Sequence, residues 1–269
     1  MNNRDYMRLL RQGNERWQDW RSQQPERPID LSEISLRGER FQGFDLRWVS
    51  LNRAQLDYVD LRGADLRFAE LVDASLIGAN LSEANLSEAK LLGSDLREAN
   101  LVGATLTGTN LAGTQLWRSQ LQQADLGSAQ LHRVSLVEAN LIEANLADVD
   151  LTSAVLNQVE ANAAHCYRAN FQRARLLRSH FVHAYLYGAD FGGADLRGAD
   201  FAWANLTKVN FAGANLQRVN LRGAKLTGAN LADADLRGAC LREVELSGMQ
   251  RRSLKWIDSQ EMIARMHYC

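Results

Sequence analysis

The sequence predicts an all-β solenoid, and three regular features of one long stretch lead to this prediction. From Leu31 to Leu246, every fifth residue is Leu or Phe, apart from Ala161 and Cys166. The rule covers 44 consecutive units, with 36 Leu and 6 Phe at the centre. The residue two before each centre is usually small, most often Ala. Of the 19 glycines, 16 lie two residues after a centre.

A five-residue apolar period fits neither an α-helix nor a straight β-strand. The chain must therefore turn at every unit, with the centre and the small residue before it pointing into one narrow core. Glycine after the centre suits a corner that needs a positive φ. Stacked corners make a solenoid in which each unit buries its centre against the units above and below. Proline would interrupt the hydrogen bonds between coils, and the stretch contains none.

Units such as Ala64-Asp65-Leu66 and Ala194-Asp195-Leu196-Arg197-Gly198 resemble the pentapeptide-repeat proteins, over about four fifths of the chain. The resemblance implies a right-handed quadrilateral β-helix with four units, about 20 residues, in each coil. The 44 units would then make about 11 coils. At the usual strand spacing of ~4.8 Å the rod would be roughly 50 Å long. Phenylalanines at every tenth residue from Phe171 to Phe211 fit four sides, because they would alternate between opposite sides and stack as two columns.

Residues 1–29 are predicted to form a short α-helical cap at the N-terminal end. Apolar residues at helical spacing, interrupted at Gly13, predict two short helices, the second capped by Asn14. Pro25 and Pro28 then deliver the chain to the first coil. The first coil of a solenoid has open backbone edges, and we expect Trp17 and Trp20 to cover them. A helical arm that binds a partner is the alternative.

Residues 30–248 form the predicted repeat domain, and residues 249–269 a C-terminal helical cap. Asp258 and Glu261 have capping-box spacing in this last segment. Cys240 and Cys269 would pair if the last helix folds back, although an odd cysteine count and a cytoplasmic location argue against it. Gyrase-protecting members of the family dimerise through their C-terminal ends. The resemblance therefore leaves a dimer contact at this end open, although a monomer is expected.

Charge and hydropathy exclude several kinds of partner. Lys plus Arg number 31 against 32 Asp plus Glu, which gives a formal charge of −1. This balance argues against a nucleic-acid binder, which would carry a basic excess. No run of 18 apolar residues and no signal segment occur. We therefore expect a cytoplasmic protein that contacts no membrane.

The sequence does not indicate a catalytic, metal or cofactor site. Asp and Asn recur before the centres along the whole repeat, which marks a structural role rather than a unique catalytic pair. His165 and Cys166 are adjacent, but one would face outward and the other inward, so Cys166 is expected to be an inert core thiol. His180 and His183 lack a third metal ligand. We therefore expect no enzyme, no cofactor and no small-molecule substrate.

The most distinctive outer surface follows an irregular stretch, residues 155–170, which contains both small centres. This irregularity is either drift in a tolerant repeat or a sign of function. Mapped onto four sides, the histidines and aromatic residues from His165 onward gather on two neighbouring sides. Such a cluster on an otherwise polar exterior is a candidate partner site. The predicted partner-binding residues are His165, Tyr167, His183, Tyr185, Tyr187 and Trp203.

Two function classes remain. The first is a non-enzymatic scaffold or regulatory module that presents flat sides to an unidentified protein partner. The second is a nucleic-acid mimic, similar to family members whose acidic rod occupies the DNA site of gyrase. Near-neutral charge counts against the mimic. A column of arginines on one side also counts against the mimic: Arg178, Arg197, Arg218 and Arg237. We expect these arginines to form surface ion pairs with Asp195 and Asp235, and binding of an anionic partner is the alternative.

Overall fold

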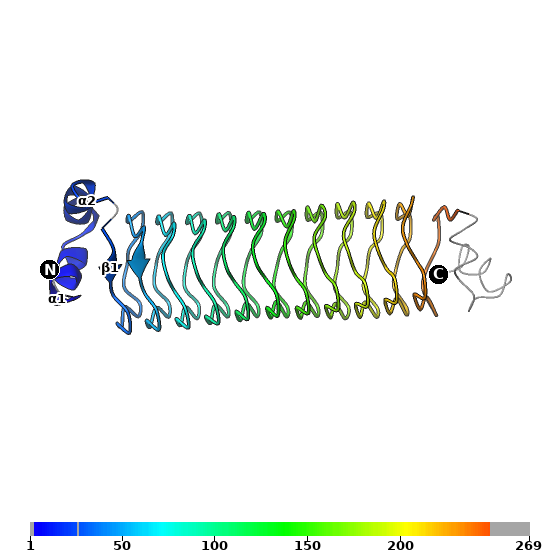
Figure 1. The fold of residues 1–269 in the computed structure, drawn as a ribbon, viewed down its shortest axis with the longest axis horizontal. Coiled ribbons are helices and arrows are strands. Elements are labelled where there is room, and N and C mark those ends of the chain that lie inside the picture. Colours follow the sequence, from blue (N-terminus) through cyan, green and yellow to red (C-terminus); the bar gives the residue numbers. More distant parts are fainter. Residues whose placement is uncertain (1–2, 26, 248–269) are drawn as a thin grey trace.

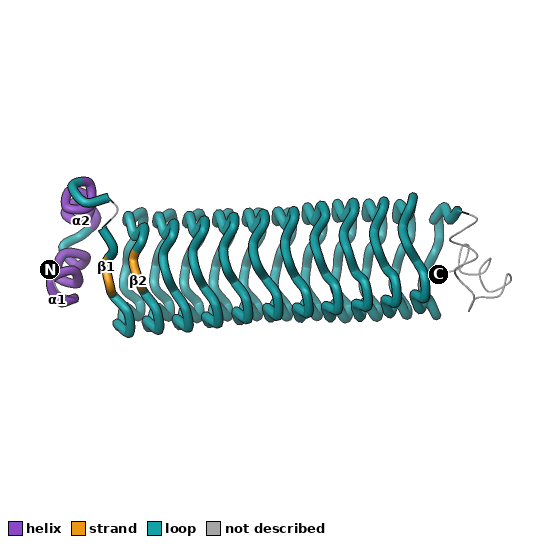
Figure 2. The backbone as a smooth tube through the Cα atoms, in the orientation of Figure 1, coloured by secondary structure: helices purple, strands orange, loops and turns teal. Residues whose placement is uncertain are grey.

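The computed structural model, in which residues 3–25 and 27–247 are described, is an elongated rod of stacked coils (Figure 1). Two short helices, α1 (Asn3–Arg11) and α2 (Asn14–Ser22), lie at one end. The strands β1 (Ile29–Asp30) and β2 (Val49–Ser50) pair in parallel. Later coils pair through isolated parallel bridges, so Figure 2 draws the rest of the repeat as loops and turns.

Each bridge joins residues 20 positions apart, from Ser35 with Gln55 to Asn220 with Cys240. The bridges recur once in every five-residue unit, so four units complete one coil. This spacing agrees with the prediction of four units per coil. The total of about 11 coils stays a prediction, and the predicted C-terminal cap lies outside the described residues, as does Cys269.

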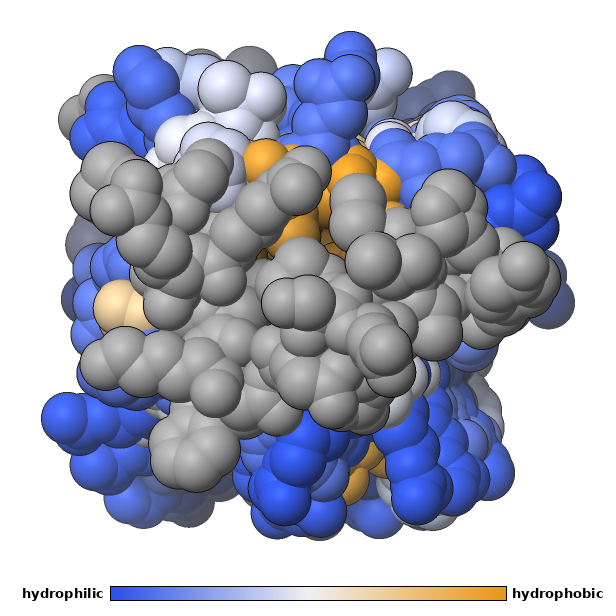
Figure 3. Space-filling view, turned by 90° about the vertical axis from the view of Figure 1, so that its right-hand side faces the viewer, coloured by the Kyte–Doolittle hydropathy of each residue, from blue (hydrophilic) through white to orange (hydrophobic). Residues whose placement is uncertain are grey.

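The unit centres form one continuous core along the rod. None of them, from Leu31 to Leu246, exposes more than 7% of its surface. Burial of each leucine side chain contributes roughly 1.5–3 kcal/mol. The small residues two before the centres are also buried from Ala54 onward. Where this residue carries a hydroxyl, it donates to a backbone carbonyl, as Ser94 does to Leu91 at 2.7 Å. Viewed along its axis, the rod is four-sided with mainly hydrophilic sides (Figure 3).

The phenylalanine columns are confirmed. Successive rings on one side are stacked, with centroids 4.5 Å apart for Phe171 and Phe191 and 5.2 Å apart for Phe181 and Phe201. Rings on opposite sides meet edge to face, at 6.1 Å for Phe171 and Phe181. Ala161 lies one coil before Phe181 on the same side and is fully buried. We infer that the large ring next to the small centre helps to keep the core filled.

Every described corner, glycine or not, has a positive φ at the residue two after the centre. The corner glycines have φ between 59° and 72°, and 28 other residues from Glu33 to Glu243 have φ between 53° and 61°. A backbone hydrogen bond closes most of these turns, for example from Ala54 N–H to the Leu51 carbonyl at 3.1 Å. Positive φ at the third residue is typical of a type II turn. The prediction for the glycines was therefore right, but the coil imposes the same conformation on every residue type.

Glycine has a second role at these corners, because it leaves room for the side chain one coil earlier. The ring of Trp203 occupies the space that a Cβ at Gly223 would need. Tyr58 lies in the same way against Gly78, where a Cβ would be 2.7 Å from the ring. Sequence reasoning missed this contact, because it considered the corner glycines only for their backbone conformation.

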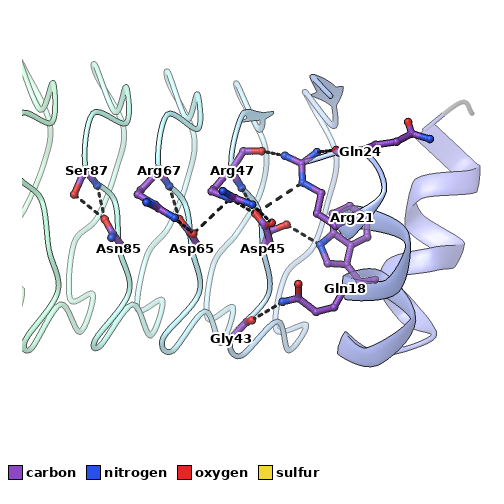
Figure 4. Close-up of polar contacts among 11 residues, drawn as sticks. Gln18, Arg21, Gln24, Gly43, Asp45, Arg47, Asp65, Arg67, Asn85 and Ser87 are labelled. Carbon is purple, nitrogen blue, oxygen red and sulfur yellow. Dashed lines mark hydrogen bonds and ion pairs between the residues drawn. The ribbon is translucent and has the colours of Figure 1, made fainter. Parts of the chain in front are cut away.

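Asp or Asn directly before a centre accepts a hydrogen bond from the backbone N–H directly after that centre. Figure 4 shows three such bonds in successive coils, at 3.2, 3.2 and 3.0 Å, with these donor and acceptor residues: Arg47 and Asp45, Arg67 and Asp65, Ser87 and Asn85. Where another residue precedes the centre, the N–H can instead donate to an Asn or Asp side chain 20 positions earlier, in the previous coil. Asn157, for example, accepts from Leu177 N–H at 3.1 Å. We call these bonds amide caps.

Helix α2 is fixed to the first coils by two buried side chains. Trp17 is fully buried, and its indole N–H donates to the Asp45 carbonyl at 2.7 Å. Arg21 exposes 1% of its surface and donates to the carbonyls of Arg27, at 2.8 Å, and Arg47 (Figure 4). Burial lowers the pKa of Arg21 below its ordinary value, and the Asp45 carboxylate, 3.8 Å away, partly offsets this effect.

The predicted cap of α2 is wrong in one detail. The position before the helix is Gly13, which makes no side-chain hydrogen bond to the helix. The Asn14 side chain instead donates to the carbonyl of Gly43 at 3.3 Å. The Asn14 side chain, which was expected to cap the helix, therefore forms its hydrogen bond with the first coil.

We expect Gly223→Ala to destabilise the rod more than Gly213→Ala. Both glycines have a positive φ, so both substitutions carry a similar backbone cost of about 1 kcal/mol. A Cβ at Gly213 meets no atom within 4 Å, whereas one at Gly223 overlaps the ring of Trp203. Thermal unfolding followed by circular dichroism measures the difference. Equal melting temperatures would contradict the contact.

We expect Arg21→Ala to loosen helices α1 and α2 while the rest of the rod stays folded. Each buried carbonyl that loses its donor costs about 1–3 kcal/mol. Hydrogen exchange of the backbone amides in residues 3–22 should therefore become faster, with protection of the coils unchanged. Arg16→Ala is the control, because Arg16 is exposed on the same helix. Equal exchange in the two variants would show that Arg21 does not hold α2.

Candidate functional site

The six predicted partner-binding residues lie on one side of the rod and on the corner beside it. We call this side the tyrosine face; its centres include Cys166, Leu186 and Leu206. His165 and Tyr185 directly precede these centres, and Tyr167 and Tyr187 directly follow them. His183 and Trp203 occupy the adjoining corner in successive coils. Tyr167, Tyr185 and Trp203 expose 46%, 52% and 45% of their surface, which makes them unusual among the large apolar side chains.

The structure brings four of the six residues together as two stacked pairs. The rings of His165 and Tyr185 are 4.7 Å apart and inclined by 17°. Those of Tyr167 and Tyr187 are 5.6 Å apart and inclined by 8°. Each pair joins equivalent positions in adjacent coils, whose spacing of ~4.8 Å suits ring stacking.

Two cations border the stacked tyrosines. The Arg168 guanidinium lies 5.9 Å from the Tyr167 ring centre and 3.2 Å from the Asp148 carboxylate. The Lys208 ammonium lies 5.4 Å from the Tyr187 ring centre, and its interaction with the Tyr187 side chain raises the pKa of Lys208. The face therefore combines aromatic surface with positive charge.

His183 and Trp203 are not part of these stacks. No ring contact within the described residues joins either of them to the four stacked rings. Trp203 packs over Gly223, with the Arg222 guanidinium 5.6 Å from its ring centre. His183 and Trp203 therefore extend the exposed aromatic surface around the corner without contacting the four stacked rings.

Free backbone donors are a feature of this face that sequence reasoning missed. An amide cap needs Asp or Asn before the centre or, in the previous coil, at the position equivalent to that of the N–H donor. His165 and Tyr185 stand before these centres, and Ala147 and Tyr167 stand at those positions in the previous coils. Within the described residues, the N–H groups of Tyr167 and Tyr187 make no hydrogen bond. The loss of Asp or Asn before successive centres of one side is the sequence signal for such donors.

The groups considered for chemistry are held in ordinary contacts. His180 Nδ1 lies 2.8 Å from the Glu160 carboxylate. Among residues 3–25 and 27–247, no three His, Cys, Asp or Glu side chains gather as metal ligands. Cys166 is fully buried while His165 is exposed, and burial raises the pKa of the Cys166 thiol. The prediction of a core thiol at Cys166 is confirmed.

A second aromatic stack occupies the other end of the rod. Trp48 and Phe68 lie 4.1 Å apart and nearly parallel, and they expose 41% and 39% of their surface. They occupy equivalent corners of adjacent coils, like Arg168 and Gly188 further along the same column. The stack shows that exposed rings on this rod can pair without a partner.

The pentapeptide-repeat family matches the sequence in 8 copies, over residues 29–67, 69–108, 99–136, 119–158, 164–202 and 204–242. This is well over half of the chain. The chain belongs to the pentapeptide-repeat family. The family implies that the four-sided coil is a right-handed quadrilateral β-helix. No curated protein sequence is significantly similar to the chain.

Several solved pentapeptide-repeat structures are similar to the chain. HetL, from the cyanobacterium Nostoc, is involved in heterocyst differentiation regulation. It is 32% identical to this chain, and the match covers 89% of this chain and 97% of HetL, with a TM-score of 0.49. A protein of the Arabidopsis thaliana thylakoid lumen is 31% identical over 41% of this chain and 73% of its own, with a TM-score of 0.28. QnrB1, a plasmid-mediated fluoroquinolone resistance protein, is 16% identical over 88% and 94%, with a TM-score of 0.45.

Within residues 3–25 and 27–247, no helix has the length and apolar character needed to cross a lipid bilayer.

We expect Cys166 to resist alkylation by iodoacetamide in the native protein. The thiolate is the reactive form, and burial both excludes the reagent and disfavours the thiolate. Mass spectrometry of peptides should find Cys166 modified only after unfolding in guanidinium chloride. Native labelling at a rate close to that of free cysteine would contradict the buried position.

Proposed function

We propose that this protein is a non-enzymatic interaction module, a rigid four-sided rod whose tyrosine face binds a protein partner. The rod comprises about 11 coils over residues 30–248. Residues 1–29 and 249–269 protect its two ends as helical caps. The packing of Trp17 and Arg21 against the first coils supports the N-terminal cap.

The observation that carries the proposal is the pair of exposed aromatic stacks on the tyrosine face. Tyrosine and tryptophan contribute disproportionately to binding energy at protein interfaces. They lose little side-chain entropy on binding, and stacking reduces this loss further. The free N–H groups of Tyr167 and Tyr187 add donors for carbonyl or carboxylate groups of a partner.

The rigid coil supports the same proposal. Backbone hydrogen bonds join adjacent coils at every unit, such as Cys166 N–H to the Tyr185 carbonyl at 2.8 Å. The rings are therefore held in place before binding, which lowers the entropy cost of association.

Competition with DNA for a topoisomerase is the alternative function. A DNA mimic needs a strong negative field along the rod. This chain has a formal charge of −1, and arginines pair with many of its carboxylates. Inhibition of gyrase supercoiling at low protein concentration would favour the mimic over the interaction module.

Affinity capture from cells of the source organism, followed by calorimetry with the captured protein, tests the proposal. We expect Tyr167→Ala/Tyr185→Ala to weaken binding by at least ~30-fold, which corresponds to a loss of about 2 kcal/mol. Trp48→Ala/Tyr58→Ala is the matched control, because it removes two exposed aromatic side chains elsewhere on the rod.

Circular dichroism should show that both variants keep the wild-type fold. The control should bind like the wild type. Equal affinity of the wild type and the Tyr167→Ala/Tyr185→Ala variant would remove the tyrosine face as the binding site.

A further inference from the structure

A second unusual surface lies on the side of the rod opposite the tyrosine face. Its centres are two units away from those of the tyrosine face, and four units complete a coil, so the two sides are opposite. We call it the arginine face. Its centres are Leu116, Leu136, Leu156, Leu176, Leu196 and Leu216.

This face carries the longest run of free amide donors in the described repeat. Gln115, Ser135 and Val155 replace the usual Asp or Asn before three successive centres. Within the described residues, the N–H groups that follow these centres make no hydrogen bond; they belong to Trp117, Val137 and Asn157. Adjacent coils are ~4.8 Å apart, so one carboxylate can accept from two neighbouring amides.

Arginines extend the same face. Arg178 and Arg218 occupy equivalent corners two coils apart, and their stems lie against Gly198 and Gly238. Neither guanidinium has an ion pair within the described residues, whereas Arg197 pairs with Asp195 at 2.7 Å. The prediction of surface ion pairs is therefore right for Arg197 and Arg237 only.

Two separate shallow grooves lie along the arginine face. One, of about 500 Å³, is lined by Trp117 and Val137 and by Asp95, whose carboxylate pairs with Arg97 at 2.7 Å. The other, of about 550 Å³, is lined in part by Asn157, Leu177 and the arginines Arg178, Arg197 and Arg218. Both follow the arginine face along the rod. The grooves therefore offer apolar surface, backbone donors and positive charge in one line.

We propose that the arginine face binds an acidic segment of a partner polypeptide in which carboxylates alternate with apolar side chains. Carboxylates would accept from the free amides at one end and from Arg178 and Arg218 at the other. Leu177, Val137 and the Trp117 ring would contact the apolar side chains.

A nucleic acid fits this surface less well. A nucleic acid needs a row of unpaired cations, but Arg197 and Arg118 on this face already pair with Asp195 and Glu138. The apolar lining also offers nothing to a phosphate chain, whereas it suits leucine or valine side chains of a peptide. The peptide is therefore the occupant that the chemistry favours.

The test is a fluorescence-anisotropy titration with a labelled peptide of alternating Glu and Leu, with a Lys-Leu peptide and single-stranded oligothymidine for comparison. We expect Arg178→Ala/Arg218→Ala to weaken binding of the Glu-Leu peptide by at least ~10-fold. The matched control is Arg168→Ala/Lys208→Ala. It removes the same charge from equivalent corners, also two coils apart and also packed against glycines, on the tyrosine face.

A second variant isolates the amides without changing charge. Gln115→Asn/Ser135→Asn/Val155→Asn should cap the three N–H groups, as Asn140 caps Ile142 at 3.1 Å. We expect weaker peptide binding and an unchanged or higher melting temperature. Gln120→Asn/Gln130→Asn, which adds equivalent caps on the two other sides, should bind normally.

Equal losses in the two charge variants would show a general electrostatic effect and overturn the proposal. Wild-type affinity in the Gln115→Asn/Ser135→Asn/Val155→Asn variant, tighter binding of oligothymidine than of the Glu-Leu peptide, or no binding of the peptide would also overturn it.

Discussion

The hydrogen bonds between coils are the constraint on which the rest of the structure depends. The N–H of a centre donates to the next coil, as Leu51 N–H does to the Glu70 carbonyl at 2.6 Å. The N–H of the residue before the following centre donates to the previous coil, as Gln55 N–H does to the Ile34 carbonyl at 2.8 Å. These bonds fix a spacing of 20 residues. Every side chain therefore lies beside the one 20 positions away, and stacks, ion pairs and free donors all follow from that alignment.

Properties that each unit carries by itself were predictable from the sequence. The buried centres, the small neighbouring residue and the positive φ all repeat with a period of five, so they could be predicted without knowing the length of a coil. The phenylalanine columns needed only the additional assumption of four sides. The packing of Trp203 over Gly223 also depends on the direction in which the exposed side chain lies, and the five-residue period does not set that direction. Asn14 was misplaced because its acceptor, Gly43, belongs to a coil and not to the helix.

The candidate site also has one part that was predictable from the sequence and one part that was not. Four of its residues stack because they occupy equivalent positions in adjacent coils, and the sequence placed them on one side. The free N–H groups of Tyr167 and Tyr187 were not foreseen, because the role of Asp and Asn as amide caps is visible only in the hydrogen bonds. Uncapped backbone N–H groups are common to the two opposite faces. On each, a residue that replaces Asp or Asn adds a new side chain and, where the previous coil supplies no cap, also releases a backbone donor.

The corner columns also limit how such a rod can change in length. Neighbours in a column are matched: Trp48 stacks on Phe68, Arg118 pairs with Glu138 at 2.7 Å, and Trp203 covers Gly223. Inserting one pentapeptide would keep every leucine inside but would shift all later units by one side, which would mismatch each column at the insertion. Inserting a whole coil leaves the later columns in register. Viable length variants of this protein should therefore differ by multiples of 20 residues, although the core alone would permit steps of five.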